Sequence, residues 1–137
     1  MSSPLPAELT GLVTPGDGRG TNLGFPTANL KLAKDHPHLC AGIYACFAQI
    51  LPATKKYHAT LHIGPRPTFS GASPSVEVYL IDFPYQKLYG KKLYLSKFKF
   101  IRSIKKFNSS QDLVQAIKQD VTKAKQILFT DDQTETN

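Results

Sequence analysis

Residues 93–101 read LYLSKFKFI, a run of strand-forming residues whose apolar alternation changes phase halfway along. Leu93 and Leu95 occupy odd positions, whereas the two phenylalanines that follow occupy even ones. Because side chains alternate between the two faces of a strand, the apolar face can change sides only at a bulge or corner, which we predict near Ser96–Lys97. Strands that bend in this way are typical of closed barrels.

Other β-rich runs lie upstream of this strand. Short apolar stretches separated by turn-forming residues predict strands at Gly42–Leu51, Tyr57–Ile63 and Ser75–Phe83. Residues Glu8–Val13 predict a further strand near the N-terminus. No internal repeat or low-complexity linker divides the chain, so we expect one domain over residues 1–128.

One helix is predicted at the end of the chain. Ser109 can cap its N-terminus, with Asp112 three residues later as in a capping box. Apolar residues then recur on one stripe at helical spacing: Leu113, Ile117, Val121, Ala124 and Leu128. The helix should pack on the barrel, and the acidic segment 129–137 is expected to be a disordered tail. The pattern alone therefore predicts a mainly β fold, a barrel with a C-terminal helix.

The composition is that of a folded, basic protein. Hydrophobic residues make up 41% of the chain and charged residues 20%, and 17 Lys and Arg against 10 Asp and Glu give a net charge of +7. Such a charge favours polyanionic partners, namely nucleic acid, an anionic membrane or a phosphorylated small molecule. Lys87–Lys106 holds eight basic residues and no acidic one. This run is typical of a solvated strand face more than of a phosphate-binding wall.

Two further features bear on the compartment. No apolar run approaches the length of a membrane span, and the N-terminus, MSSPLP, lacks the basic and apolar regions of a signal peptide. Cys40 and Cys46 are the only cysteines, without further ligands at a zinc-like spacing. One disulfide is possible, but two free thiols are the favoured interpretation. We therefore expect a cytoplasmic protein.

A glycine-rich stretch at residues 16–24 is the first candidate for binding chemistry. Its glycines alternate with other residues, so backbone N–H groups can turn inward as an anion-binding nest, to which Arg19 adds a cation. A flexible surface loop is the alternative interpretation. The stretch is not a nucleotide P-loop, because the Lys-Ser/Thr pair is missing, nor a dinucleotide fingerprint.

Pro26-Thr27-Ala28-Asn29 follows the glycines. If the segment is extended, Thr27 and Asn29 lie on the same side. Their hydroxyl and amide oxygens are hard, neutral ligands that suit Mg²⁺. The alternative is a proline turn with a capping asparagine.

Glu77 is a carboxylate within an apolar strand, flanked by Val76 and Val78. It either faces solvent on the outside of the barrel or has a function. If it lines a cleft, it can accept a proton from an attacking hydroxyl group, as the catalytic aspartate of kinases does.

Taken together, these motifs resemble the riboflavin kinase family. The resemblance rests on six segments in family order, GDGRGTNLGFPTANL, AGIYACF, IGPRPTF, SVEVYLIDF, LYGKKLYL and FKFIRSIKKF, followed by a final helix. It covers roughly Leu9–Leu128. It implies a six-stranded Greek-key antiparallel barrel with one packed helix, and transfer of the ATP γ-phosphate to the ribityl 5′-hydroxyl of riboflavin, which forms FMN.

The resemblance also implies roles for individual residues. Residues expected to bind ATP are Gly16, Gly18, Arg19, Gly20, Thr21 and Thr27. Thr27 and Asn29 would hold the metal, Mg²⁺ with Zn²⁺ as the alternative, and Glu77 would be the catalytic base. Arg102, in the flap around Ile101–Phe107, is expected to bind the flavin.

The expected partners are riboflavin, FMN, ATP and ADP, without a membrane or nucleic acid, and we expect a monomer. The family includes stand-alone kinases and C-terminal modules of bifunctional FAD synthetases, and the sequence leaves both origins open. Since the 137 residues hold no trace of the adenylyltransferase half, FMN but not FAD is the expected product.

Two other functions remain as alternatives. A nucleic-acid-binding barrel would use the basic run and its interleaved aromatic residues as a stacking surface, although Phe98 and Phe100 are expected in the core. A non-catalytic flavin-binding barrel would have no chemical need for Glu77, Thr27 and Asn29.

Overall fold

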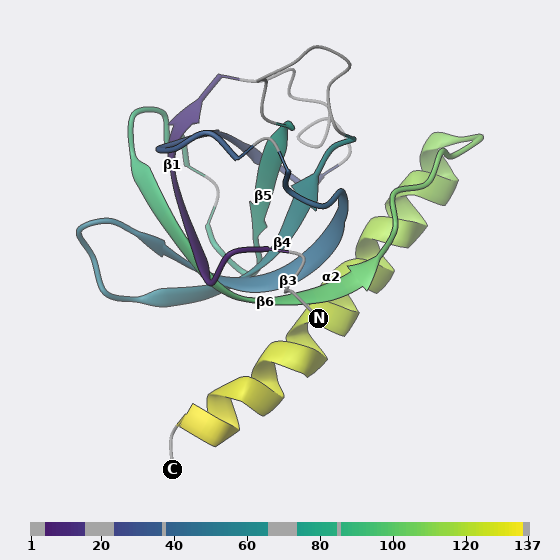
Figure 1. Ribbon diagram of the computed structural model, residues 1–137. Helices are drawn as coiled ribbons and strands as arrows, with labels where there is room; N and C mark the ends of the chain where they lie inside the picture. Colours follow the sequence, from purple (N-terminus) through teal and green to yellow (C-terminus); the bar gives the residue numbers. More distant parts are fainter. Residues whose placement is uncertain (1–4, 16–23, 37, 66–73, 85, 136–137) are drawn as a thin grey trace.

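The computed structural model describes residues 5–15, 24–36, 38–65, 74–84 and 86–135. These residues form a closed antiparallel barrel in the order β1-β2-β5-β4-β3-β6 and a helix, α2, that crosses its outside (Figure 1). The elements are β1 (Glu8–Thr14), β2 (Ala28–Leu32), β3 (Gly42–Ile50), β4 (Lys56–Ile63), β5 (Val76–Leu80), β6 (Lys92–Arg102) and α2 (Ser110–Glu135). Because β6 returns to lie beside β3, the strands β3 to β6 form a Greek key. The predicted fold class is confirmed.

The strands form close to their predicted positions, with two differences. β2 is the strand that hydrophobic pattern alone did not identify, because it is short and carries a lysine and an asparagine among its five residues. β5 ends at Leu80, earlier than predicted. A turn with Asp82 at φ 57° follows it, and this left-handed conformation does not continue a strand.

The phase change in β6 is produced by a β-bulge at the predicted place. Lys97 has φ 61°, and the register with β3 passes from Phe47↔Ser96 to Ala45↔Lys99, so β6 gains one residue. Phe98 accordingly packs against the barrel core. The expectation that Phe100 is a core residue is wrong, because its side chain is 52% exposed. A second register shift between Ile43 and Tyr44 follows the bulge.

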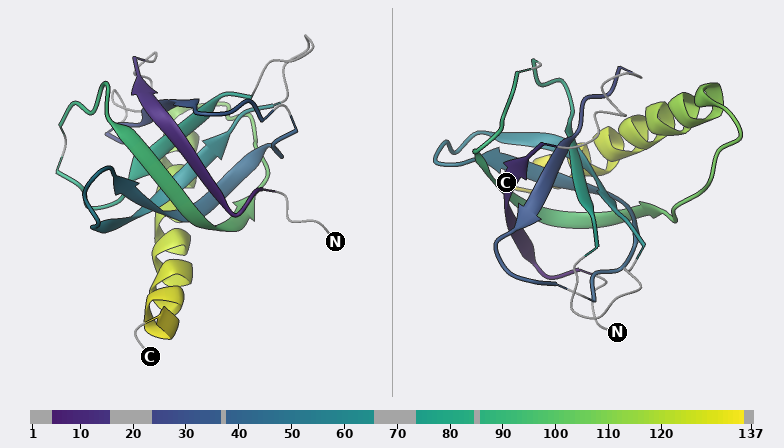
Figure 2. Two further views of the ribbon diagram at one scale, coloured as in Figure 1. Left: turned by 60° about the vertical axis from the view of Figure 1, so that its left-hand side comes forward. Right: turned by 90° about the horizontal axis from the view of Figure 1, so that it is seen from above.

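β3 is buried on both faces from Gly42 to Ala48. Tyr44 and Cys46 point into the barrel and belong to its main core cluster. Ala45 and Phe47 point outward, into a second apolar cluster with Ala124 and Leu128 of α2. Figure 2 shows the helix lying across the outside of the strands. The predicted packing of an apolar helix stripe on the barrel is thus confirmed.

α2 begins at the predicted cap. The Ser109 Oγ accepts a hydrogen bond from the Asp112 backbone N–H at 3.1 Å, which satisfies one of the free donors of the first turn. The helix does not end with its apolar stripe at Leu128 but continues to Glu135. Its last turns extend past the barrel (Figure 1). The structure thus places helix in most of the segment 129–137 that was expected to be disordered.

Both cysteines are free thiols, as predicted. Cys40 is exposed, whereas Cys46 lies in the barrel core, where burial raises the pKa of its thiol to about 12. Cys46 is therefore a packing residue without thiolate chemistry. Among the described residues, no helix has the length and apolar character needed to cross a membrane.

Candidate active site

A polar row crosses the outer face of three neighbouring strands. The register pairs Asn29 of β2 with Glu77 of β5, and Glu77 with His62 of β4. The neighbours of Glu77 on β5, Val76 and Val78, are buried in the barrel core, so the carboxylate points to the outside. Directly paired residues on one face have Cβ atoms about 5 Å apart. The row therefore brings an amide, a carboxylate and an imidazole together from distant parts of the chain.

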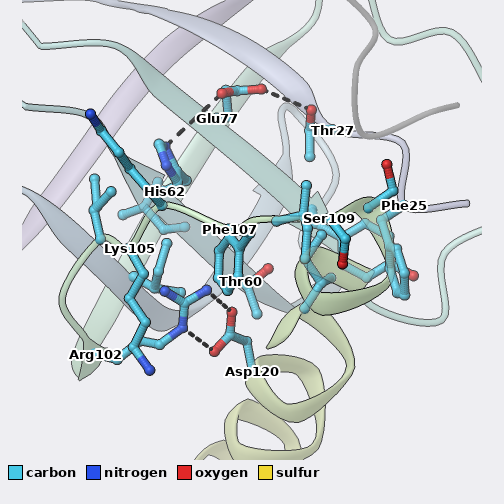
Figure 3. Close-up of a pocket in the computed structure, with 18 of the residues that line it drawn as sticks. Phe25, Thr27, Thr60, His62, Glu77, Arg102, Lys105, Phe107, Ser109 and Asp120 are labelled. Carbon is cyan, nitrogen blue, oxygen red and sulfur yellow. Dashed lines mark hydrogen bonds and ion pairs between the residues drawn. The ribbon is translucent and has the colours of Figure 1, made fainter. Parts of the chain in front are cut away.

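Glu77 lies between two polar side chains (Figure 3). The Thr27 hydroxyl donates a hydrogen bond of 3.1 Å to Oε1 of Glu77. The Nδ1 atom of His62 lies 4.0 Å from Oε2. The Glu77 side chain is 29% exposed, so the carboxylate, bound by Thr27 and flanked by His62, is still open to a ligand.

A pocket of about 860 Å³ opens in front of this carboxylate. Its walls are the outer faces of β4 and β5, the first turns of α2 and the segment 104–109 that connects β6 to the helix. Aromatic rings from three parts of the chain line it: Phe25, Tyr79 and Phe107. The rings of Phe25 and Tyr79 pack edge to face at 5.5 Å. The volume and the mixed aromatic and polar lining suit a small organic molecule with an aromatic ring system.

Arg102 lies on the opposite side of this pocket from Glu77 and is joined to α2 (Figure 3). Its Nε and Nη2 atoms donate to the two carboxylate oxygens of Asp120, each at 2.8 Å. Its Nη1 atom donates to the Ser103 carbonyl, and the guanidinium carbon lies 5.7 Å from the centre of the Phe107 ring. Sequence reasoning missed Asp120, because a charged residue within a helix is usually solvated.

A second pocket of about 270 Å³ lies on the other side of Thr27. Asn29 lines it, together with Thr14, Lys87 and residues at the end of β5. Thr27 and Tyr79 line both pockets. The two pockets therefore adjoin at Thr27, whose hydroxyl is bound to the Glu77 carboxylate in the larger pocket.

The structure brings three of the predicted site residues together: Thr27, Asn29 and Glu77. Arg102 lines the same pocket as Glu77. The predicted ATP-binding residues Gly16, Gly18, Arg19, Gly20 and Thr21 lie outside the described residues. His62 was missed, since a single histidine in an alternating strand carries no signal of its position beside Glu77.

The oxygen atoms of Thr27 and Asn29 suit a divalent cation of the Mg²⁺ type. Thr27, just before β2, offers a hydroxyl oxygen and Asn29, within β2, an amide oxygen, beside the Glu77 carboxylate. In the part of the chain that is described, no three His, Cys, Asp or Glu side chains gather to hold a metal on their own. Mg²⁺ suits such a sparse set because it takes few protein ligands and completes its shell with water and substrate phosphates.

The chain also matches a known protein family. The family model for flavokinase, described as riboflavin kinase, matches residues 3–128. The chain belongs to the riboflavin kinase family. The two pockets and the row of polar residues between them are therefore features of a member of this family.

Individual relatives point in the same direction. The bifunctional riboflavin kinase/FMN adenylyltransferase of Bacillus subtilis is 37% identical over 122 residues, which cover 87% of this chain and 38% of that protein. The RNA-binding riboflavin kinase RibR of Bacillus subtilis is 34% identical over 116 residues, covering 83% of this chain and 48% of that protein. The chain thus spans less than half of these relatives.

A solved structure is also similar. It is described as a macrolide-efflux protein from Streptococcus pneumoniae, and it matches with a TM-score of 0.74 and 34% sequence identity over 84% of this chain and 37% of the other. The similarity covers most of this chain and well under half of that protein.

Proposed function

We propose that the protein is a riboflavin kinase that transfers the γ-phosphate of ATP to the ribityl 5′-hydroxyl of riboflavin. The observation that carries this proposal is the position of Glu77, which lines the larger pocket and is bound by Thr27, a residue of both pockets, in a member of the riboflavin kinase family. The larger pocket, lined by aromatic rings, suits the flavin. The smaller pocket, which Asn29 and Lys87 line, suits part of the nucleotide.

The chemistry follows from this arrangement. The Glu77 carboxylate accepts the proton of the 5′-hydroxyl while the hydroxyl oxygen forms a bond to the γ-phosphorus. The bond between that phosphorus and the β,γ-bridging oxygen breaks, and ADP leaves with the electron pair. The Thr27 hydroxyl takes one lone pair of Oε1, and the remaining lone pairs of the carboxylate can accept the proton.

A divalent cation is part of the proposal. Thr27 and Asn29 would hold Mg²⁺, or Zn²⁺ in its place, and the ion would neutralise charge on the transferring phosphates. The glycine-rich segment with Gly16, Gly18, Arg19, Gly20 and Thr21 would cover those phosphates.

Arg102 has two roles in the proposal. Its two hydrogen bonds to Asp120 join the end of β6 to α2. Because it also lines the larger pocket, it would contact the flavin there. In this proposal the enzyme acts as a monomer. The two free thiols fit a reducing compartment such as the cytoplasm.

The decisive experiment incubates the purified chain with riboflavin, ATP and Mg²⁺ and separates the flavins by chromatography. We expect FMN and an equal amount of ADP, and neither product when a chelator removes the metal. The same chromatogram reports whether FAD forms. If riboflavin binds but no FMN appears with Mg²⁺ or Zn²⁺, the protein is the non-catalytic flavin-binding barrel instead.

A further inference from the structure

His62 has an unusual environment in the larger pocket. Its Nδ1 atom is buried and has no hydrogen-bond partner among the described residues, although the side chain as a whole is 39% exposed. A buried polar atom without a partner is costly and rare in native proteins. The nearest charged atom recorded for it is Oε2 of Glu77, at 4.0 Å, and the two residues are direct partners in the β4–β5 register.

The chemistry of the two groups determines which tautomer of His62 fits. An ionised carboxylate oxygen can only accept hydrogen bonds. A bare Nδ1 lone pair facing Oε2 would be repelled, whereas an Nδ1–H group facing it is attracted. The tautomer of an imidazole is set by the hydrogen bond that its nitrogen atoms make. The position of Glu77 therefore favours the proton on Nδ1.

The 4.0 Å between His62 Nδ1 and Glu77 Oε2 is too long for a hydrogen bond, but a small movement would form one. A hydrogen bond requires about 2.7–3.2 Å, so the two side chains must approach by roughly 1 Å. Direct strand partners can do so by small side-chain rotations, without moving the backbone. Oε1 is already bound by the Thr27 hydroxyl, and Oε2 is the oxygen that remains for His62.

We propose that His62 is a positioning residue for Glu77. It carries its proton on Nδ1 and donates it as a hydrogen bond to Oε2 when the site is in its working state. With Thr27 on Oε1 and His62 on Oε2, the carboxylate cannot rotate, and its free lone pairs stay directed into the pocket. This inference rests on the proposed role of Glu77 as the base of a riboflavin kinase.

The kinetic test compares two substitutions of similar size. In His62→Asn the side-chain Nδ2 lies where Nδ1 lies in histidine and keeps an N–H donor, whereas His62→Leu keeps the bulk without a donor. We expect His62→Leu to lower kcat about tenfold or more, as for a lost hydrogen bond to a charged group, with KM for both substrates nearly unchanged. His62→Asn should keep most of the wild-type kcat. Equal rates for the two variants would overturn the proposal.

The second test does not depend on activity. Nitrogen-15 NMR of the histidine ring at about pH 8, where an ordinary imidazole is neutral, shows which nitrogen of His62 carries the proton. We expect Nδ1–H in the wild type and a shift toward Nε2–H in Glu77→Gln. A proton on Nε2 in the wild type contradicts the proposal. If the wild type makes no FMN, the proposed function fails, and the NMR result still decides the contact between His62 and Glu77.

Discussion

The outer surface of the barrel differs between its two sides. Over β5 and β4 the outward positions include Glu77 and His62, and a pocket lies in front of them. Over β3 the outward positions include Ala45 and Phe47, which are buried in an apolar cluster with residues of α2. In β3, β4 and β5 alike, every second side chain points outward from the barrel. The difference therefore arises from which residues occupy the outward positions and from how closely the helix approaches them.

The same helix serves both sides. Near its start, Leu113 and Ile117 line the pocket, and further along, Ala124 and Leu128 pack on β3. Because the second half of α2 is packed on β3, the first half is held in place as a wall of the pocket and does not fill it. Stability and chemistry are thus located on different parts of one barrel surface, and substitutions should be able to affect one without the other.

The largest effect is expected on the polar side, from Glu77→Gln. This change keeps the shape of the side chain and removes the base, so kcat for FMN formation should fall by about 10²–10⁴-fold. ATP and riboflavin binding, measured by calorimetry, and the thermal unfolding midpoint should stay close to wild type. Normal turnover in this variant would remove Glu77 from the role of base.

A large loss of stability is expected on the apolar side, from Leu128→Ala. Leu128 is fully buried between α2 and β3, and truncation of such a leucine costs about 2–5 kcal/mol of unfolding free energy, measured by urea denaturation. Phe129→Ala is the matched control, because its side chain is 60% exposed and should change stability little. At a temperature where the variant is folded, kcat should change much less than in Glu77→Gln. Equal destabilisation by the two helix variants would contradict the packing described above.

A smaller effect is expected where the two sides meet, from Asp120→Ala. This change leaves the Arg102 guanidinium without its partner in a site where that side chain is only 19% exposed. We expect the free energy of unfolding, measured by urea denaturation, to fall by about 2 kcal/mol, which is below the cost of breaking a fully buried ion pair. The KM for riboflavin should also rise, since Arg102 borders the segment that closes the pocket.

Lys125→Met provides the control for Asp120→Ala. Lys125 forms an ion pair of 3.2 Å with Asp82, but these side chains are 46% and 78% exposed. Exposed pairs contribute at most about 1 kcal/mol. If Asp120→Ala and Lys125→Met lower the free energy of unfolding by the same small amount, the ion pair between Arg102 and Asp120 does not fix α2 to the barrel.

Much of the fold follows from local pattern. The bulge at Lys97 could be predicted because the phase of β6 changes there, and the helix start because Ser109 is a good cap. Phe100 was misassigned, because alternation identifies a face of the strand but not where the barrel ends. The end of α2 was also missed, since apolar periodicity reports packing, and a helix can continue beyond its packed part.

The site was only partly predictable. Thr27, Asn29 and Glu77 are unusual in their local sequence and resemble a family motif, so they could be selected from the chain. His62 and Asp120 carry no such local signal. Their significance arises from partners 15 and 18 residues away, Glu77 and Arg102, and such pairs are defined only by strand register and helix placement.

The double burial of β3 has a consequence for the dynamics of the chain. From Gly42 to Ala48 neither face of the strand meets water, and both edges are paired, with β4 and with β6. A local fluctuation therefore has no way to expose the amide hydrogens of this strand without separating the helix and opening the barrel. These amides exchange with solvent through the rarest opening events, so β3 belongs to the slowest cooperative unit.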